Sequence, residues 1–173
     1  VTAFQFPFAI NLHDCELNDE GKPGEGGKAP DKKPYKTKGE QQKDWLCYLL
    51  KAISELNGVA GNHARSYFEM APASIVIRVT DSLVAGYETY GFKTDGSFTE
   101  VVDGILHDDY PGNEFYMGGR LVKEVLQSNV GKPSAESIEK TLQDKGVNTF
   151  RMANQALDAV AKTVCGKSFL IKG

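Results

Sequence analysis

A run that reads as an amphipathic helix followed by a β-branched strand constrains the fold of this chain most. In residues 40–57, apolar side chains recur at spacings of three and four, which predicts a helix with one apolar face. They are Trp45, Leu46, Leu49, Leu50, Ile53 and Leu56. Gly58 is suited to end that helix, and the sequence SIVIRVT at 74–80 is typical of a strand. A helix and a strand this close together favour a fold that mixes both.

The remaining patterns add strands before and after this unit. In residues 3–12, Phe4, Phe6, Phe8 and Ile10 alternate with period two, which predicts a strand with one apolar face. Pro7 has no N–H group to donate and therefore indicates an edge position or a bulge. Residues 84–92 predict a neighbour for the strand at 74–80, with a turn at 93–97.

The C-terminal third is mainly helical in pattern. Residues 98–106 fit either a helix or a strand, and 114–117 predict a short strand closed by two glycines. Three helices are expected at 120–128, from Ser134 as N-cap, and from Asn148 or Thr149, followed by a final strand at 168–172. This order predicts a single α+β domain over residues 1–173, with an antiparallel sheet and a mainly helical region at 120–164.

Composition and charge narrow the class of protein. The chain has 173 residues, of which 40% are hydrophobic and 25% charged, as in globular domains. Its net charge of −3 argues against coating duplex DNA through bulk charge, although a local basic groove remains compatible with it. No apolar run reaches the roughly 20 residues that span a bilayer. Three widely spaced cysteines form no disulfide or zinc framework, so we expect a cytoplasmic protein without a cofactor.

A long polar segment at about 18–39 carries one candidate site. It is rich in Gly, Lys, Pro, Asp and Glu, which predicts a mobile loop. Four lysines flank Tyr35: Lys32, Lys33, Lys36 and Lys38. Lysines beside an aromatic ring suit single-stranded nucleic acid, since they neutralise phosphates while the ring stacks on a base. The alternative is a solvated loop whose acidic neighbours cancel much of this charge.

A second candidate lies between the predicted helix and the strand at 74–80. Gly61 permits close approach of another backbone, and Asn62, His63 and Arg65 supply hydrogen-bond donors. Such a segment can hold a sugar-phosphate backbone. The alternative is that the glycines only end the helix and that Arg65 pairs with a carboxylate such as Glu69.

An acidic group offers a different chemistry. Asp103, His107, Asp108 and Asp109 together suggest a divalent metal site of a phosphohydrolase-like enzyme. Adjacent aspartates point to different sides in an extended chain, and the following Tyr-Pro-Gly indicates a turn in which Asp bonds locally. We therefore favour a solvated turn.

The segments at 45–56, 61–66 and 72–80 together resemble one known family. Their sequences WLCYLLKAISEL, GNHARS and PASIVIRVT are similar to those of the DevR-type CRISPR-associated autoregulators, the repeating backbone subunit of type I Cascade. The resemblance covers about residues 3–92. It departs at Ala60, where a second glycine is common in the family.

The resemblance implies an RRM-like (ferredoxin-like) palm without catalytic activity. Copies of such a palm stack along the guide RNA (crRNA), grip its sugar-phosphate backbone, and assemble with other Cascade subunits that find target DNA through the guide. It places Gly61, Asn62, His63 and Arg65 beside the RNA. Because family members are about twice as long, and the chain begins at Val1, we expect it to be the C-terminal half of a fold that an N-terminal half completes. A metal-dependent enzyme and a purely structural interaction domain are the alternatives.

Overall fold

The computed structural model describes residues 4–12, 38–56, 59–60, 67–68, 70–82, 84, 86–126 and 137–170. Its main elements are α1 (Lys38–Ser54), β1 (Val59–Ala60), β2 (Tyr67–Phe68), β3 (Ser74–Arg78), α2 (Thr99–Leu106), β4 (Phe115–Gly119), α3 (Ile138–Asp144), β5 (Asn148–Phe150) and α4 (Ala153–Cys165). A 3₁₀ turn, η1 (Gly112–Glu114), precedes β4, and a π-helix, η2 (Leu121–Leu126), follows it.

One three-stranded sheet organises the molecule, in the order β3-β4-β5. β3 and β4 are antiparallel, with Val76 opposite Met117, whereas β5 runs parallel to β4, with Thr149 opposite Met117. The predicted α+β class is confirmed and is consistent with a ferredoxin-like, RRM-like fold. The sheet is mixed rather than antiparallel, because the chain returns through η2 and α3 before β5 and therefore enters β5 in the direction of β4.

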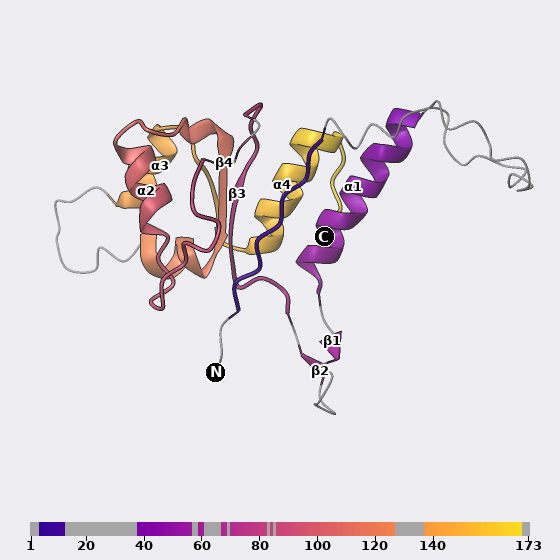
Figure 1. Ribbon diagram of the computed structural model, residues 1–173, viewed down its shortest axis with the longest axis horizontal. Coiled ribbons are helices and arrows are strands. Elements are labelled where there is room, and N and C mark those ends of the chain that lie inside the picture. The colour runs from indigo at the N-terminus through magenta and orange to yellow at the C-terminus, as the bar shows by residue number, and fades with distance from the viewer. Residues whose placement is uncertain are drawn as a thin grey trace, which may run out of the picture.

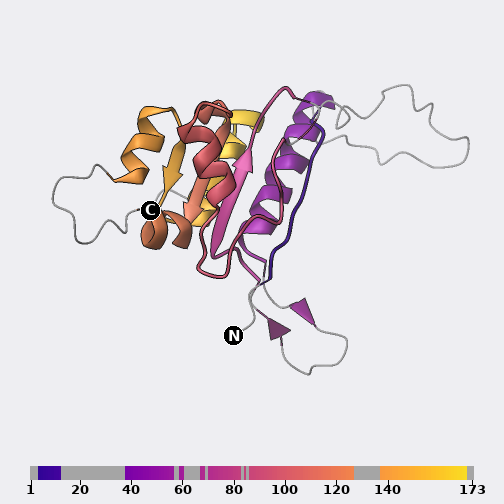
Figure 2. The same cartoon turned by 60° about the vertical axis from the view of Figure 1, so that its left-hand side comes forward.

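Helices cover both faces of this sheet. Figures 1 and 2 show α4, with α1 packed beside it, on one side and α2 and α3 on the other. The alternation of a strand explains the two layers: Phe115 and Met117 face α2 and α3, whereas Tyr116 between them faces α4. All five residues of β4 are consequently buried.

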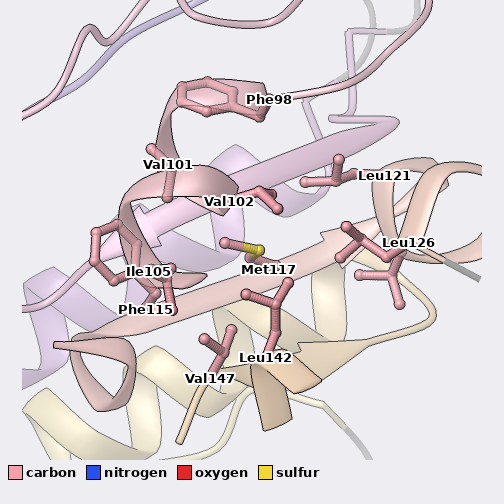
Figure 3. Packing of buried hydrophobic residues seen from close by; sticks show 11 residues of the cluster. Phe98, Val101, Val102, Ile105, Phe115, Met117, Leu121, Leu126, Leu142 and Val147 are labelled. Carbon is pink, nitrogen blue, oxygen red and sulfur yellow. The ribbon is translucent and has the colours of Figure 1, made fainter. Parts of the chain in front are cut away.

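The first core fills the space between the sheet and the layer of α2, η2 and α3 (Figure 3). Phe98, Val101 and Ile105 reach it from α2 and the residue before it, and Leu142 reaches it from α3. All four side chains are at most 2% exposed. Burial at this level contributes about 1.5–3 kcal/mol for each large apolar side chain.

The second core lies between the sheet and the helices α4 and α1. Ile75 and Ile77 of β3 meet Leu157 and Val160 of α4, and Leu50 of α1 closes the cluster. Gly118 allows the close approach of α4 to β4, since a Cβ atom at that position would lie 2.9 Å from the Cβ atom of Ala156. A side chain on residue 118 would therefore push the helix away.

Several predicted elements need correction. Residues 84–92 were expected to be the neighbour of β3, but β4 takes that position. Residues 148–150 form β5 instead of opening a helix, and α4 begins at Ala153. α3 is capped by Ser137, whose hydroxyl accepts a hydrogen bond from the backbone N–H of Lys140, whereas the predicted cap Ser134 lies outside the described residues. Of residues 98–106, which fitted either a helix or a strand, Thr99–Leu106 form helix α2, and 168–170 are not a strand.

The N-terminal segment also differs from its prediction. Residues 4–11 are extended, but no described strand pairs with them. Phe8 packs against the second core, whereas Phe4 and Phe6 are each 74% exposed. The segment is fixed by Gln5, whose side-chain amide exchanges two hydrogen bonds with the backbone of Phe92, at 2.6 and 3.2 Å. Alternation therefore predicted an extended chain correctly but not its place in a sheet.

Among the helices of the described parts, none has the length and apolar character that crossing a membrane requires.

Candidate nucleic-acid interface

The predicted RNA-contacting residues fall largely outside the described part of the chain. This holds for Gly61, Asn62, His63 and Arg65, and for Lys32, Lys33 and Lys36 of the polar segment. Lys38 is the first residue of α1, and its side chain is also outside the description. The structure therefore locates these candidates only through the elements that flank them.

Two short strands flank the glycine-containing segment. β1 and β2 are antiparallel, and Ala60 is paired with Tyr67. Directly paired residues of antiparallel strands have Cα atoms about 4.5–5.5 Å apart. The six residues between them, 61–66, therefore leave and re-enter the fold at neighbouring points.

This strand pair is separate from the three-stranded sheet. β1 and β2 form a sheet of their own, and both views place them beyond the C-terminal end of α1 (Figures 1 and 2). At the base of the pair, the backbone N–H of Met70, which follows β2, donates to the carbonyl of Leu56, which precedes β1, at 2.8 Å. Ala60 and Tyr67, at which the segment 61–66 begins and ends, therefore belong to a strand pair outside the three-stranded sheet.

The three-stranded sheet offers no open face for a nucleic acid. An RRM stacks bases on aromatic side chains of an exposed sheet surface. Here the aromatic side chains of the central strand, Phe115 and Tyr116, are 0% and 8% exposed and lie under helices on opposite faces. Any contact of this part of the chain with RNA must therefore use loops, helix surfaces or strand edges.

The acidic residues considered for a metal site have structural contacts instead. Asp108 adopts a positive φ of 65° at the end of α2, and its carboxylate binds the Lys145 ammonium at 2.5 Å. The ring Nδ1 of His107 lies 2.8 Å from the carbonyl oxygen of Asp103, and the backbone N–H of Asp109 donates to Gly104. No group of three or more His, Cys, Asp or Glu side chains within the described ranges is arranged to hold a metal ion.

Arg78, part of the stretch that resembles the CRISPR family, is committed to the fold. Its guanidinium donates to Glu114 at 2.7 Å and lies over the rings of Tyr110 and Phe115, 5.6 and 5.5 Å from their centres. The side chain is 12% exposed. Arg78 therefore ties β3 to the segment that follows α2.

A basic hollow beside α1 was not foreseen from the sequence. A cavity of about 230 Å³ lies between α1 and residues 167–169, with Tyr48, Lys51 and Lys167 in its lining. Lys167 forms an ion pair with Asp44, which cancels part of the positive charge. Tyr48 and Lys51 lie one helical turn apart, so their spacing in the sequence could have indicated that they line a common surface.

The described thiols are unsuited to nucleophilic chemistry. Burial raises the pKa of Cys165 to about 11, and the neighbouring Cys47 adds to this effect. Burial also raises the pKa of Cys47 itself. Both thiols are therefore protonated near neutral pH, and only the thiolate is a strong nucleophile.

Comparison of the chain with models of protein families and with curated proteins found no match.

Proposed function

We propose that this chain is a non-catalytic subunit that binds the sugar-phosphate backbone of a guide RNA in a type I CRISPR surveillance complex. In that role it supports RNA-guided recognition of DNA in antiviral defence, in the cytoplasm and together with other copies and other Cascade subunits. The basis is the resemblance of residues 45–56, 61–66 and 72–80 to the DevR-type family. The same resemblance implies a further polypeptide segment that completes the palm.

The pairing of Ala60 with Tyr67 is the observation that carries the proposal. It brings both ends of the segment 61–66 together, outside the three-stranded sheet. Gly61 and Arg65 within it have the chemistry for close backbone approach and for phosphate binding.

The covered sheet gives independent support for contact through the backbone of the RNA. A subunit that carries guides of any sequence has to bind phosphate and sugar groups, which position the RNA without reading it. Stacking of bases on the central strand is prevented by the helices on both faces. Binding through a loop is compatible with both requirements.

The decisive measurement is the salt dependence of binding to single-stranded RNAs of equal length and unrelated sequence. Arg65→Ala is expected to weaken binding to all of them equally. It should also reduce the slope of log K against log salt concentration by roughly 0.7, the value for one phosphate contact on a single strand. Arg120→Ala is the control, because this exposed arginine binds Glu124 at 2.8 Å and lies outside the segment.

Two results argue for the alternatives. If Arg65→Ala leaves affinity and slope unchanged, the segment is structural and the proposed contact is wrong. If Asp108→Ala or Asp109→Ala abolishes a metal-dependent turnover while RNA binding persists, the chain is an enzyme. Nucleic acid of defined length that co-purifies with the protein agrees with the proposal.

A further inference from the structure

Charged side chains are divided unevenly between the two helical layers. Around α2, η2 and α3, the described residues 99–126 and 137–147 carry eight acidic and four basic side chains, a balance of −4. Around α1 and α4, the described side chains of residues 41–56 and 151–170 include three acidic and five basic ones, a balance of +2. A polyanion is therefore attracted to the side of α1 and α4. The basic residues of this side are Lys43, Lys51, Arg151, Lys162 and Lys167.

Two hollows on this side are lined by cations, and both border the segment 168–170. The cavity of about 230 Å³ beside α1 has Lys51 and Lys167 in its lining, together with residues 168 and 169. A second cavity, of about 370 Å³, has Arg151 and Lys162 in its lining, together with residue 170. We call the two cavities and the segment between them the basic track.

The middle of the basic track is fixed by the fold. The buried carboxylate of Asp158 accepts hydrogen bonds from the Ser168 hydroxyl and from the Phe169 N–H, both at 2.8 Å. The ammonium of Lys162 lies 2.6 Å from the same carboxylate and compensates its charge. A surface that is ordered before binding loses little conformational freedom when a ligand binds.

The cations of the track favour a ligand with several anionic groups. Lys162 and Lys167 pair with Asp158 and Asp44, whereas Lys51 and Arg151 have no ion pair within the described ranges. These two are therefore available to anions, one in each cavity. Pockets that enclose a small molecule measure about 300–1,000 Å³, and the cavities lie below or near the lower limit. A chain of linked anions that crosses both cavities fits the track better than one compact anion.

An aromatic side chain distinguishes a nucleic acid from an acidic protein as this ligand. Tyr48 is 65% exposed and lines the same cavity as Lys51. Cations beside an exposed ring bind single-stranded nucleic acid, because the ring stacks on a base while the cations bind phosphates. An acidic protein segment would use the cations but has no need of the ring.

The track can be reached from the segment 61–66. Lys51 lies in the last turn of α1, and β1, at which that segment begins, lies beyond this end of the helix (Figures 1 and 2). One RNA strand can therefore contact both places.

We propose that the basic track is a second RNA-binding surface, on which Lys51 and Arg151 bind phosphates and Tyr48 stacks on a base. The identity of the ligand rests on the proposed function, but the track uses no residue of the segment 61–66. Its failure and the failure of the contact at Arg65 are therefore separate results.

The salt dependence of binding to the same single-stranded RNAs tests the two cations. Lys51→Ala and Arg151→Ala should each reduce the slope of log K against log salt concentration by roughly 0.7, the value for one phosphate contact. Lys140→Ala is the matched control, since this exposed lysine lies on α3, in the acidic layer, and its loss should leave the slope unchanged.

Two substitutions of Tyr48 test the stacked base. Tyr48→Ala should weaken RNA binding on the order of tenfold, because it removes the ring. Tyr48→Phe keeps the ring and should bind like the wild type. Circular dichroism checks that both variants are folded.

The outcomes separate the two proposals. If Lys51→Ala and Arg151→Ala behave like Lys140→Ala, the basic track does not bind RNA, even where Arg65→Ala reduces the slope. If the track variants reduce the slope and Arg65→Ala does not, the track is supported and the contact at Arg65 is wrong. Polyglutamate that competes as strongly as RNA, together with a Tyr48→Ala variant that binds RNA normally, assigns the track to an acidic protein and overturns the inference.

Discussion

Asp158 is the buried charged side chain of the described chain, at 1% exposure. Its carboxylate accepts hydrogen bonds from the Ser168 hydroxyl and the Phe169 N–H, both at 2.8 Å, and from the Leu170 N–H at 3.1 Å. The Lys162 ammonium is 2.6 Å away. One residue of α4 thereby holds 168–170 in place, where a strand had been predicted.

The protonation of Asp158 couples this contact to pH. Burial raises the pKa of the carboxyl, but the hydrogen bonds from Lys162, Leu170, Ser168 and Phe169 together outweigh it, so the pKa lies below its ordinary value. A carboxyl whose pKa is lowered in the folded state stabilises the fold above its unfolded pKa of about 4. That stabilisation is lost as the pH falls through the lowered value.

Asp158→Asn is expected to lower the free energy of unfolding at pH 7 by about 2 kcal/mol, because an amide cannot accept all of these bonds. Urea denaturation at several pH values measures the difference. It should shrink as the pH falls below the unfolded pKa of about 4 and through the lowered pKa of the folded state, since the wild-type carboxyl then becomes protonated. Asp144→Asn, at an exposed position of α3, should change little at any pH. A difference that is independent of pH contradicts this account of Asp158.

At the scale of elements, the sequence patterns predicted the helices, strands and turns that depend on residues close together in the chain. The helix at 40–57, the strand at 74–80 and the turn at 93–97 are present as α1, β3 and a hydrogen bond from the Lys93 N–H to the Ser97 carbonyl at 2.9 Å. The predicted partner of β3 was wrong, because pairing across about 40 residues depends on packing that no local pattern contains. Likewise, the period of α1 indicated its apolar residues but not which of its two sides meets α4.

The candidate site was predictable only as a motif. Gly61 and Arg65 were identified as candidates from the chemistry of their residue types. The pairing of β1 with β2 was not predicted, because each strand has two residues and is too short to give a sequence pattern. From the sequence alone, the acidic group at 103–109 was also a candidate site, for a divalent metal ion. Its contact with Lys145 comes from a residue 37 positions away from Asp108, which explains why the sequence alone left a metal site open.

The contact of α4 with β4 provides a test at this scale. Gly118→Ala places a Cβ atom 2.9 Å from both the Ala156 Cβ atom and the Met152 carbonyl oxygen. The expected cost is about 1–3 kcal/mol in the free energy of unfolding, typical of overpacking. Urea denaturation of Gly118→Ala, Ala156→Gly and the double variant measures it.

The double variant is the control for this prediction. If the Cβ contact causes the loss, the double variant should be more stable than the sum of the two single effects predicts. Strict additivity would show that the cost arises elsewhere, for example in the backbone of residue 118.

At the scale of the whole molecule, the two cores share one sheet. Every residue of β4 is buried, and the strand contributes side chains to both cores. The two cores pack on opposite faces of the same strand, so unfolding of one core would expose the strand against which the other core packs. We therefore expect one cooperative unfolding transition for the described fold.

Ile105→Val tests this expectation from the side of α2. Ile105 is fully buried in the first core, so removing one methylene group should cost about 0.5–1.5 kcal/mol. Trp45 reports from α1, on the opposite side of the sheet. Its fluorescence transition in urea, measured at low protein concentration, should move by the same amount as the transition in circular dichroism.

Val160→Ala, in the second core, is the matching change on the side of Trp45. It should also move both signals together. A Trp45 transition that keeps its wild-type midpoint in Ile105→Val shows that the two layers unfold separately.

The position of the shared strand β4 in the chain also determines when the two cores can form during synthesis. β4 begins at Phe115, well after α1 and β3 have been synthesised. At roughly 5–20 residues per second, about 2–8 seconds pass between the end of β3 and the end of β4. During that interval the nascent chain carries Leu50, Ile75 and Ile77 without the strand and the helix that later cover them, and exposed apolar surface of this kind favours aggregation.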